Sequence, residues 1–576
     1  MSYFDFHLHN FSKHFLTGAD KLKRVSLDKA VGTCVSIPEL GFILTSQSAP
    51  YQAAIPNAIL CSAIVPLERG FPKQNTLKNI APRLTRLDRS FIADVANGSI
   101  SYWDLFTKEL EYGMEAFKNQ FPNFQLLNEN KPSPDEGKTG IVIAIEGAHA
   151  FMKNSGNAAD NLLEIRIAAK EQGYCILYST LTHLTCIDEP NNQKELATFS
   201  YGMKMMKDEV FHPRGKGISD EGLKFIKSAY STHNGLLPVL IDVKHASLLS
   251  RKQFYKFRKD NPELIKINGS NFKEIPIIAS HCGVTGLSWN KFANEVLSVE
   301  KEGGVVALQI ARPKAGNNPR KAWFNPWSIN LFDEDIQYII KSGGLIGISI
   351  DQRVLGFEPL FGKITGGTSL IFGEEYMSKE EFDMLGVEVD ELPKRMAAHI
   401  KGLKEEQASQ QLEKLLGIGE QDFNKRLHTW YFCYNLLHIL KIGFDHYKDQ
   451  KLNTQDAMDK AWEHVCIGSD FDGLIDPVNS FRKITEWNDF EKKLNKHLED
   501  ARNFYISIRN NTELPIEGKK GINQYIKQLM FENGKKFIEN WLGNKITPIN
   551  FGNGMPKKKN SRVKKNHLQS KPSANP

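Results

Sequence analysis

The sequence lacks any apolar run long enough to cross a membrane. Its 576 residues are 41% hydrophobic and 24% charged, and the longer hydrophobic stretches all contain a charged residue or a glycine. A membrane helix needs roughly 18 consecutive apolar residues. A strand-like segment already begins at Tyr3, so we expect no secretory signal either. These absences predict a cytoplasmic protein that does not associate with membranes.

The sequence has no cysteine motif that is typical of disulfide scaffolds, zinc sites or catalysis. The seven cysteines are scattered along the chain, and none belongs to a Cys-x-x-Cys pair. A disulfide scaffold and a cysteine-ligated zinc site are therefore not expected. The sequence has no Gly-x-Ser-x-Gly motif, and Cys282 beside His281 has no separate activating motif. Neither a serine nor a cysteine nucleophile is favoured.

The body of the chain also lacks a basic bias. The net charge is +7, but seven lysines and arginines lie between residues 557 and 571, and residues 556–576 contain no acidic residue. The rest sums to about zero, which argues against nucleic acid as a partner. The composition of residues 551–576 predicts a basic, disordered tail. A weak contact of this tail with polyanions stays open.

Eight short apolar segments alternate with amphipathic stretches. Most are rich in isoleucine and valine, as strands buried on both faces must be. The alternation predicts parallel strands joined by helices, for example over 160–173, and eight strands can close a (β/α)₈ barrel. An open, doubly wound sheet is the alternative. The eight segments are 3–9, 58–68, 141–147, 174–181, 239–243, 276–280, 345–350 and 465–469.

The connections between these segments are uneven in length. More than 110 residues separate the seventh segment from the eighth, far more than an ordinary return in such a fold. Within them, Ser-Lys-Glu-Glu at 378–381 is a capping box that opens a helix. We expect residues 352–430 to be a largely helical insertion and 107–140 a second one. Both would lie within a single barrel domain of residues 1–550.

Histidine and acidic residues cluster where the predicted strands end. In a barrel these ends converge on one axis, and alternate residues of a strand share a face, so His7 and His9 point the same way. A carboxylate such as Glu146 can bridge two cations, which can share an attacking hydroxide. Asp470 could then move protons. The predicted ligands of two divalent ions, Zn²⁺ first and Mn²⁺ second, are His7, His9, Glu146, His245 and His281.

Each of these residues also has a structural interpretation. His245 and His281 are consistent with buried core histidines that bind no metal. Asp470 and Asp472 are consistent with residues that cap a turn. Glu146 is the strongest single member, because a carboxylate at the end of an apolar strand is costly to bury without a positive partner. The prediction therefore rests on the joint pattern.

The order of these motifs resembles the membrane (renal) dipeptidase family of the metal-dependent amidohydrolase superfamily. The segments that carry the resemblance are 7-HLH-9, 145-IEGAH-149, 182-TH-183, 241-IDVKH-245, 279-ASHCG-283 and 467-IGSDFDG-473. The resemblance implies a two-zinc barrel in which Glu146 bridges the metals. It also implies that His183 holds the substrate carbonyl oxygen and that Asp470 shuttles protons during dipeptide hydrolysis. Residues 352–430 and the tail have no counterpart.

Two positions depart from the family pattern. Animal members have aspartate where this chain has His9, which raises the charge of the site by one. The family also places an arginine that binds the substrate carboxylate before an asparagine, whereas this chain has Ile329 before Asn330. Arg312, Arg320 and Arg353 are candidates to replace that arginine, because one guanidinium is enough for a carboxylate.

Three functions remain open at this point. The first is hydrolysis of an amide bond in a small peptide-like substrate. The second is phosphoester hydrolysis on the same two-metal barrel, and the third is a binding protein that keeps the fold without activity. Assembly as a homodimer also stays open.

Overall fold

The structure is a computed structural model of the chain. It describes residues 2–544 apart from gaps at 19–23, 33–44, 50, 52–54, 56, 74–85, 154–156, 188–194, 203–208, 268–271, 317–322, 357–371, 403–419 and 510–512. The predicted basic tail, 551–576, and Arg320 lie outside the described residues.

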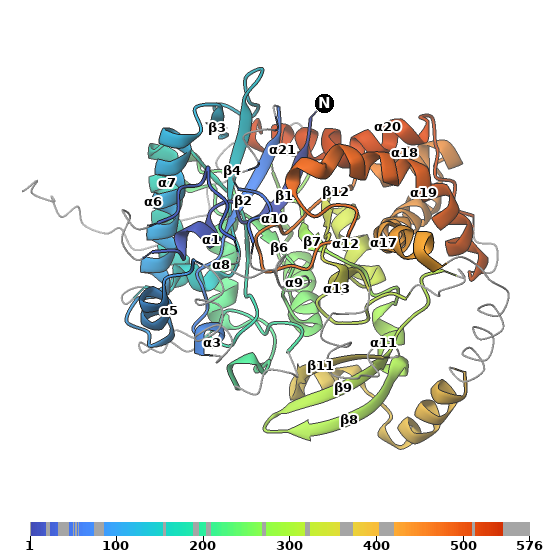
Figure 1. The fold of residues 1–576 in the computed structure, drawn as a ribbon. Coiled ribbons are helices and arrows are strands. Elements are labelled where there is room, and N and C mark those ends of the chain that lie inside the picture. The colour runs from blue at the N-terminus through green and yellow to red at the C-terminus, as the bar shows by residue number, and fades with distance from the viewer. Residues whose placement is uncertain are drawn as a thin grey trace, which may run out of the picture.

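The chain folds as a mixed α/β protein around parallel strands (Figure 1). Each of the eight segments predicted as strands overlaps one, although 276–280 shares only its last two residues with β7. A five-strand path joins β1 (Phe4–Leu8), β2 (Ile59–Ile64), β4 (Thr139–Ile145), β5 (Ile176–Thr180) and β6 (Leu240–Asp242), and the short β3 (Phe124–Leu126) pairs with β4. A second parallel sheet has the order β12 (Val465–Ile467), β10 (Ile346–Ile348), β7 (Ala279–Cys282).

The two parallel sheets touch at both of their ends. Leu8 at the end of β1 forms an isolated parallel bridge with Phe471, just after β12. Two backbone hydrogen bonds of 2.8 Å join the same segments, from His9 N to Phe471 O and from Asp470 N to His7 O. At the other end, Asp242 of β6 bridges Ile278, next to β7. The strand ends that carry the predicted site therefore lie side by side.

Helices lie outside these strands and connect them in sequence. Figure 1 shows α6 and α7 along one side of the strands and α17 and α19 along the opposite side. The principal helices are α6 (Tyr102–Gln120), α7 (Ala158–Glu171), α8 (Asp220–Tyr230), α9 (Leu248–Asp260), α12 (Asp333–Lys341), α17 (Glu420–Asp449), α18 (Thr454–Trp462), α19 (Trp487–Ser507), α20 (Ile522–Lys527) and α21 (Asn533–Leu542). Shorter helices include α1 (Ser12–Phe15), α11 (Trp289–Glu295), α13 (Gln352–Leu355) and α15 (Lys379–Leu385).

Local sequence signals explain where several helices begin and end. The Asn157 side chain accepts a hydrogen bond from Asp160 N at the start of α7, and Gly173 follows its last turn at φ 80°. The predicted capping box also forms, because the Ser378 hydroxyl accepts from Glu381 N at the start of α15. Of residues 107–140, the first fourteen continue α6, and β3 lies in the remainder.

A three-stranded antiparallel sheet was not predicted from the sequence. It consists of β8 (Val296–Glu302), β9 (Val305–Ala311) and β11 (Phe372–Ser378), with β9 in the centre. Because β11 lies within 352–430, that stretch contains a strand as well as its helices. Among the described residues, no helix is long and apolar enough to cross a membrane.

Candidate metal centre

The five predicted metal ligands meet around the carboxylate of Glu146, which follows β4 and is 2% exposed. Its Oε1 lies 2.8 Å from His245 Nε2 and 3.3 Å from His281 Nε2. Its Oε2 lies 3.1 Å from His9 Nε2 and 3.6 Å from His7 Nε2. Each carboxylate oxygen thus faces its own pair of imidazoles. This is the arrangement that a carboxylate bridging two cations requires.

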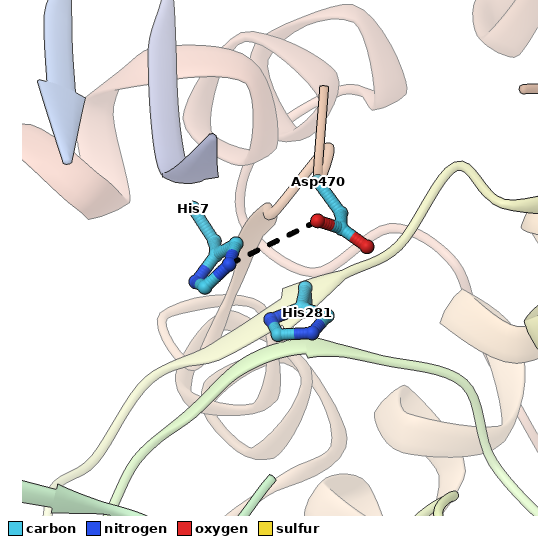
Figure 2. Close-up of side chains that lie close together, drawn as sticks. All are labelled: His7, His281 and Asp470. Carbon is cyan, nitrogen blue, oxygen red and sulfur yellow. Dashed lines mark ion pairs between the residues drawn. The ribbon is translucent and has the colours of Figure 1, made fainter. Parts of the chain in front are cut away.

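Asp470, from the turn after β12, reaches the same cluster. Its Oδ1 lies 3.3 Å from His9 Nε2 and 3.9 Å from His7 Nε2. Figure 2 shows His7, Asp470 and His281 gathered together, with a dashed line marking the His7–Asp470 ion pair. The Asp470 side chain is 16% exposed, whereas His7 and His9 are at most 1% exposed. It is therefore the carboxylate of this cluster that solvent can reach.

Hydrogen bonds behind β1 orient its two imidazoles. His7 Nδ1 lies 2.8 Å from the Tyr178 hydroxyl, which donates its own proton to Phe6 O at 2.8 Å. The hydroxyl can then only accept, so His7 carries its proton on Nδ1. His9 Nδ1 likewise donates to Ala63 O at 3.2 Å. In the neutral rings both Nε2 atoms present lone pairs to the cluster, as metal-binding histidines do.

The other imidazole pair is held differently. His281 Nδ1 lies 2.8 Å from Ser280 Oγ, which again leaves Nε2 for the cluster. His245 Nδ1 is buried, and none of the described residues forms a hydrogen bond with it. The backbone of His245 fixes this residue instead, because its carbonyl accepts from Ser200 N at 2.7 Å and from Ser200 Oγ at 3.1 Å.

The turn after β12 separates the roles of its two aspartates. Asp472 accepts from Gln47 N at 2.8 Å and from Ser48 N at 3.0 Å, so it anchors a neighbouring loop. Asp470 faces the histidines. A Cβ on Gly473 would lie 2.0 Å from Asp470 Oδ1, far inside any real contact. Glycine at 473 therefore makes room for the Asp470 carboxylate.

The electrostatics of the cluster favour bound positive charge. Burial alone would raise the pKa of Glu146, but the charges of His183 and His7 hold it well below its ordinary value. Burial opposes the charged form of His9, yet hydrogen bonds with Asp470 and Glu146 raise its pKa to about 10, so a proton occupies the position at Nε2 where a divalent ion would bind in its place. Burial, reinforced by the charge of His183, lowers the pKa of His245 to about 3. Buried carboxylates among imidazole lone pairs fit a divalent metal ion.

His183, after β5, lies beside the predicted ligands. Its Nε2 is 3.8 Å from Glu146 Oε1, and its Nδ1 is 2.7 Å from Glu68 Oε2. Glu68 is 1% exposed and was not among the predicted site residues. The signal was present, because the apolar segment 58–68 ends on this carboxylate just as 141–147 ends near Glu146.

Two of the predicted substrate-binding residues bind the chain itself. Asn330 is fully buried, and its Nδ2 donates to Asn325 O at 3.1 Å and to Val354 O at 2.9 Å. Arg312 is 6% exposed, and its Nη2 donates to Gly356 O at 2.5 Å.

Arg353, the third such residue, lies against the turn that carries Asp470. Its Nη2 donates to Leu474 O at 3.0 Å, and its Nε lies 3.0 Å from both carboxylate oxygens of Asp351. The Arg353 side chain is 27% exposed. Of the two predicted arginines that the structure describes, it is therefore the one with a partly exposed guanidinium and a contact to the turn that carries Asp470.

No protein-family model matches the chain, and no protein with a curated description is significantly similar to it. A solved metallo peptidase from Rhodobacter sphaeroides, liganded with a phosphinate mimic of the dipeptide L-Ala-D-Ala, is 11% identical with a TM-score of 0.39, over 94% of this chain and 99% of that one. A probable dipeptidase from Pseudomonas aeruginosa is 14% identical with a TM-score of 0.37, over 86% of each chain. A dipeptidase AC, a metallo peptidase of family M19, is 12% identical with a TM-score of 0.37, over 94% of this chain and 99% of that one. All three of these similar structures are described as metallo peptidases or dipeptidases.

Proposed function

We propose that this protein is a metal-dependent hydrolase that cleaves the amide bond of a small, dipeptide-like substrate. The observation that carries the proposal is the Glu146 carboxylate, whose two oxygens face two separate pairs of imidazoles. The order of motifs that resembles the membrane dipeptidase family supports amide hydrolysis as the reaction.

We further propose that the parallel strands form one closed (β/α)₈ barrel. The parallel bridges at both ends of the two sheets, Leu8 with Phe471 and Asp242 with Ile278, support closure. A closed barrel explains why residues from β1, β4, β6, β7 and β12 meet at one place, since the carboxyl ends of barrel strands surround one axis.

The proposed ligand sets follow from the distances around Glu146. His7 and His9 with Oε2 would hold one divalent ion, and His245 and His281 with Oε1 would hold the other. Imidazole and carboxylate donors suit zinc, and manganese is the alternative. Two such ions would supply a water of lowered pKa and polarise a carbonyl oxygen.

The residues of the chain would then orient the substrate and move protons. Asp470 is partly exposed and could take a proton at Oδ1 and pass it to the departing amine nitrogen. Burial opposes the charged form of His183, but the carboxylates of Glu68 and Glu146 raise its pKa. The charged ring has a proton on Nε2 as well as on Nδ1, and Nε2 could donate to the carbonyl oxygen as negative charge develops on it. Arg353, beside the same turn, is the candidate to bind a substrate carboxylate in place of the arginine that Ile329 replaces.

The experiment that tests this function combines elemental analysis with a substrate panel. The purified protein should contain close to two transition-metal ions per chain. It should hydrolyse L,L- or L,D-dipeptides with added Zn²⁺ or Mn²⁺, and this activity should disappear with a chelator and return with metal. Turnover of phosphodiesters without turnover of peptides would instead establish the phosphoester hydrolase. Absence of both metal and turnover would indicate a binding protein.

A further inference from the structure

The two carboxylate oxygens of Glu68 have different partners. Oε1 accepts from Leu184 N at 3.2 Å, from Thr185 N at 3.0 Å and from Thr185 Oγ1 at 2.8 Å. Oε2 lies 2.7 Å from His183 Nδ1. Oε1 therefore stabilises the backbone turn after β5, and Oε2 forms a hydrogen bond with the imidazole of His183 in the same turn.

The bond to Glu68 determines which way the His183 ring faces. Because Nδ1 points to Glu68, Nε2 lies on the opposite side of the ring, 3.8 Å from Glu146 Oε1. The ring also meets that of His245 edge to face, with centroids 4.5 Å apart. The ring of His183 thus lies between two buried carboxylates: Glu68, in the segment after β2, and Glu146, in the candidate metal centre.

We propose that Glu68 is a positioning residue that acts through His183. It accepts a hydrogen bond from Nδ1–H, fixes the ring, and leaves Nε2–H directed at the substrate carbonyl. This inference rests on the proposed amide hydrolysis. A carboxylate that orients an imidazole by accepting its second N–H is a recurrent device in active sites, where such partners set the tautomer and the ring orientation.

The charge of Glu68 is consistent with this role. Burial would raise its pKa, but the charge of His183 and the hydrogen bond to it lower the pKa below the ordinary value. Glu68 is thus ionised in the fold and can only accept hydrogen bonds. An acceptor at this place forces His183 Nδ1 to carry the proton.

The variant Glu68→Gln separates the two roles of the side chain. Its amide oxygen can still accept from Leu184 and Thr185, so the turn should be kept. Its NH₂ group would face His183 Nδ1 and donate to it, which would drive the Nδ1 proton away. We expect kcat to fall about tenfold to a hundredfold, as for other outer partners of active-site histidines. KM should stay within about threefold and the metal content should not change.

Glu375→Gln is the matched control. Glu375 is also a fully buried carboxylate, and it accepts from Ser328 N at 3.0 Å and from Ser328 Oγ at 2.9 Å. It holds a backbone turn without touching a catalytic histidine. This variant should keep the wild-type kcat, which would show that replacing a buried carboxyl group by an amide does not by itself impair turnover.

Two further measurements decide the inference. The double variant Glu68→Gln/His183→Asn should be no slower than His183→Asn alone, since a residue that acts only through His183 has nothing left to orient. In ¹⁵N-histidine spectra, assigned with the His183→Asn variant, Glu68→Gln should move the Nδ1 signal of His183 from protonated towards unprotonated.

The outcomes that would overturn the positioning role are distinct from failure of the proposed function. An unchanged kcat, a change confined to KM, a loss of metal, or additive losses in the double variant would each refute it. An unchanged Nδ1 signal in Glu68→Gln would refute it without any substrate. If the wild type hydrolyses no amide, the proposed function fails, whereas the spectrum still reports whether Glu68 sets the tautomer.

Discussion

Substitution of Glu146 by glutamine is the most direct test of the bridging arrangement. The change keeps volume and shape, but only one oxygen remains and the other becomes an NH₂ group that donates. The oxygen can serve either the His245–His281 pair, at 2.8 and 3.3 Å, or the His7–His9 pair, at 3.6 and 3.1 Å. The pair that faces the NH₂ group loses its anionic ligand.

The expected loss of affinity follows from the lost charge. Two unit charges about 4 Å apart interact by about 4 kcal/mol at an effective dielectric constant of 20. Every 1.4 kcal/mol corresponds to about a tenfold change in affinity, so the deprived site should bind its ion at least about a thousandfold more weakly.

Elemental analysis after dialysis against a weak chelator measures this loss. The wild type should retain close to two ions per chain, and Glu146→Gln should retain at most one. Isothermal titration of the stripped variant should show a single tight site. Glu375→Gln, which replaces a buried carboxyl group by an amide away from the cluster, is the control and should keep both ions. Full occupancy in Glu146→Gln would refute the bridging assignment.

Three further changes have defined outcomes. Asp470→Asn should keep the metals and lose about a hundredfold or more in kcat, because the amide cannot accept the proton; retained turnover would remove Asp470 as the shuttle. Gly473→Ala should reduce kcat similarly, since the new Cβ would lie 2.0 Å from Asp470 Oδ1, whereas Gly521→Ala, which meets nothing closer than 3.9 Å, should not. Burial raises the pKa of Glu375 to about 8 against the hydrogen bonds from Ser328. The folded state therefore binds this proton more tightly than the unfolded chain, and the wild type should lose about 1.4 kcal/mol of stability per pH unit relative to Glu375→Gln between pH 5 and 8; equal pH profiles in denaturant unfolding would contradict this.

The strands could be predicted because burial on both faces leaves a clear composition. Each of the eight predicted segments overlaps a strand, and within each of the two parallel sheets the neighbouring strands follow the order of the chain. The sheet of β8, β9 and β11 was missed, although Gly303–Gly304 between two apolar runs is a recognisable hairpin signal. The pairing of β9 with β11 joins residues that are 61 to 73 positions apart, and a local sequence pattern does not predict such a contact.

The site was predictable to the extent that strand geometry determines it. His7 and His9 share a face because alternate residues of a strand do, and Glu146 ends an apolar run. Residues on loops were harder to place. Asn330 and Arg353 are chemically suited to a substrate, yet Asn330 bonds the backbone and Arg353 pairs with Asp351. Such contacts depend on how distant loops pack, and the sequence does not encode this locally.

The backbone around the cluster has a conformational cost that explains its dense hydrogen bonding. His245, Asp470 and Asp472 have φ of 66°, 60° and 68°, in the left-handed region that non-glycine residues rarely enter. Each such residue costs on the order of 1–3 kcal/mol unless its surroundings fix it. The Ser200 bonds to the His245 carbonyl, the Asp470 N–H bond to His7 O, and the anchoring of Asp472 by Ser48 N are the contacts that fix these three turns. A strand end that turns sharply can aim its side chain at the candidate site, so the loops that bind these turns support the site although none of the predicted metal ligands lies in them. Substitutions in these loops should therefore impair metal binding and turnover before they unfold the protein.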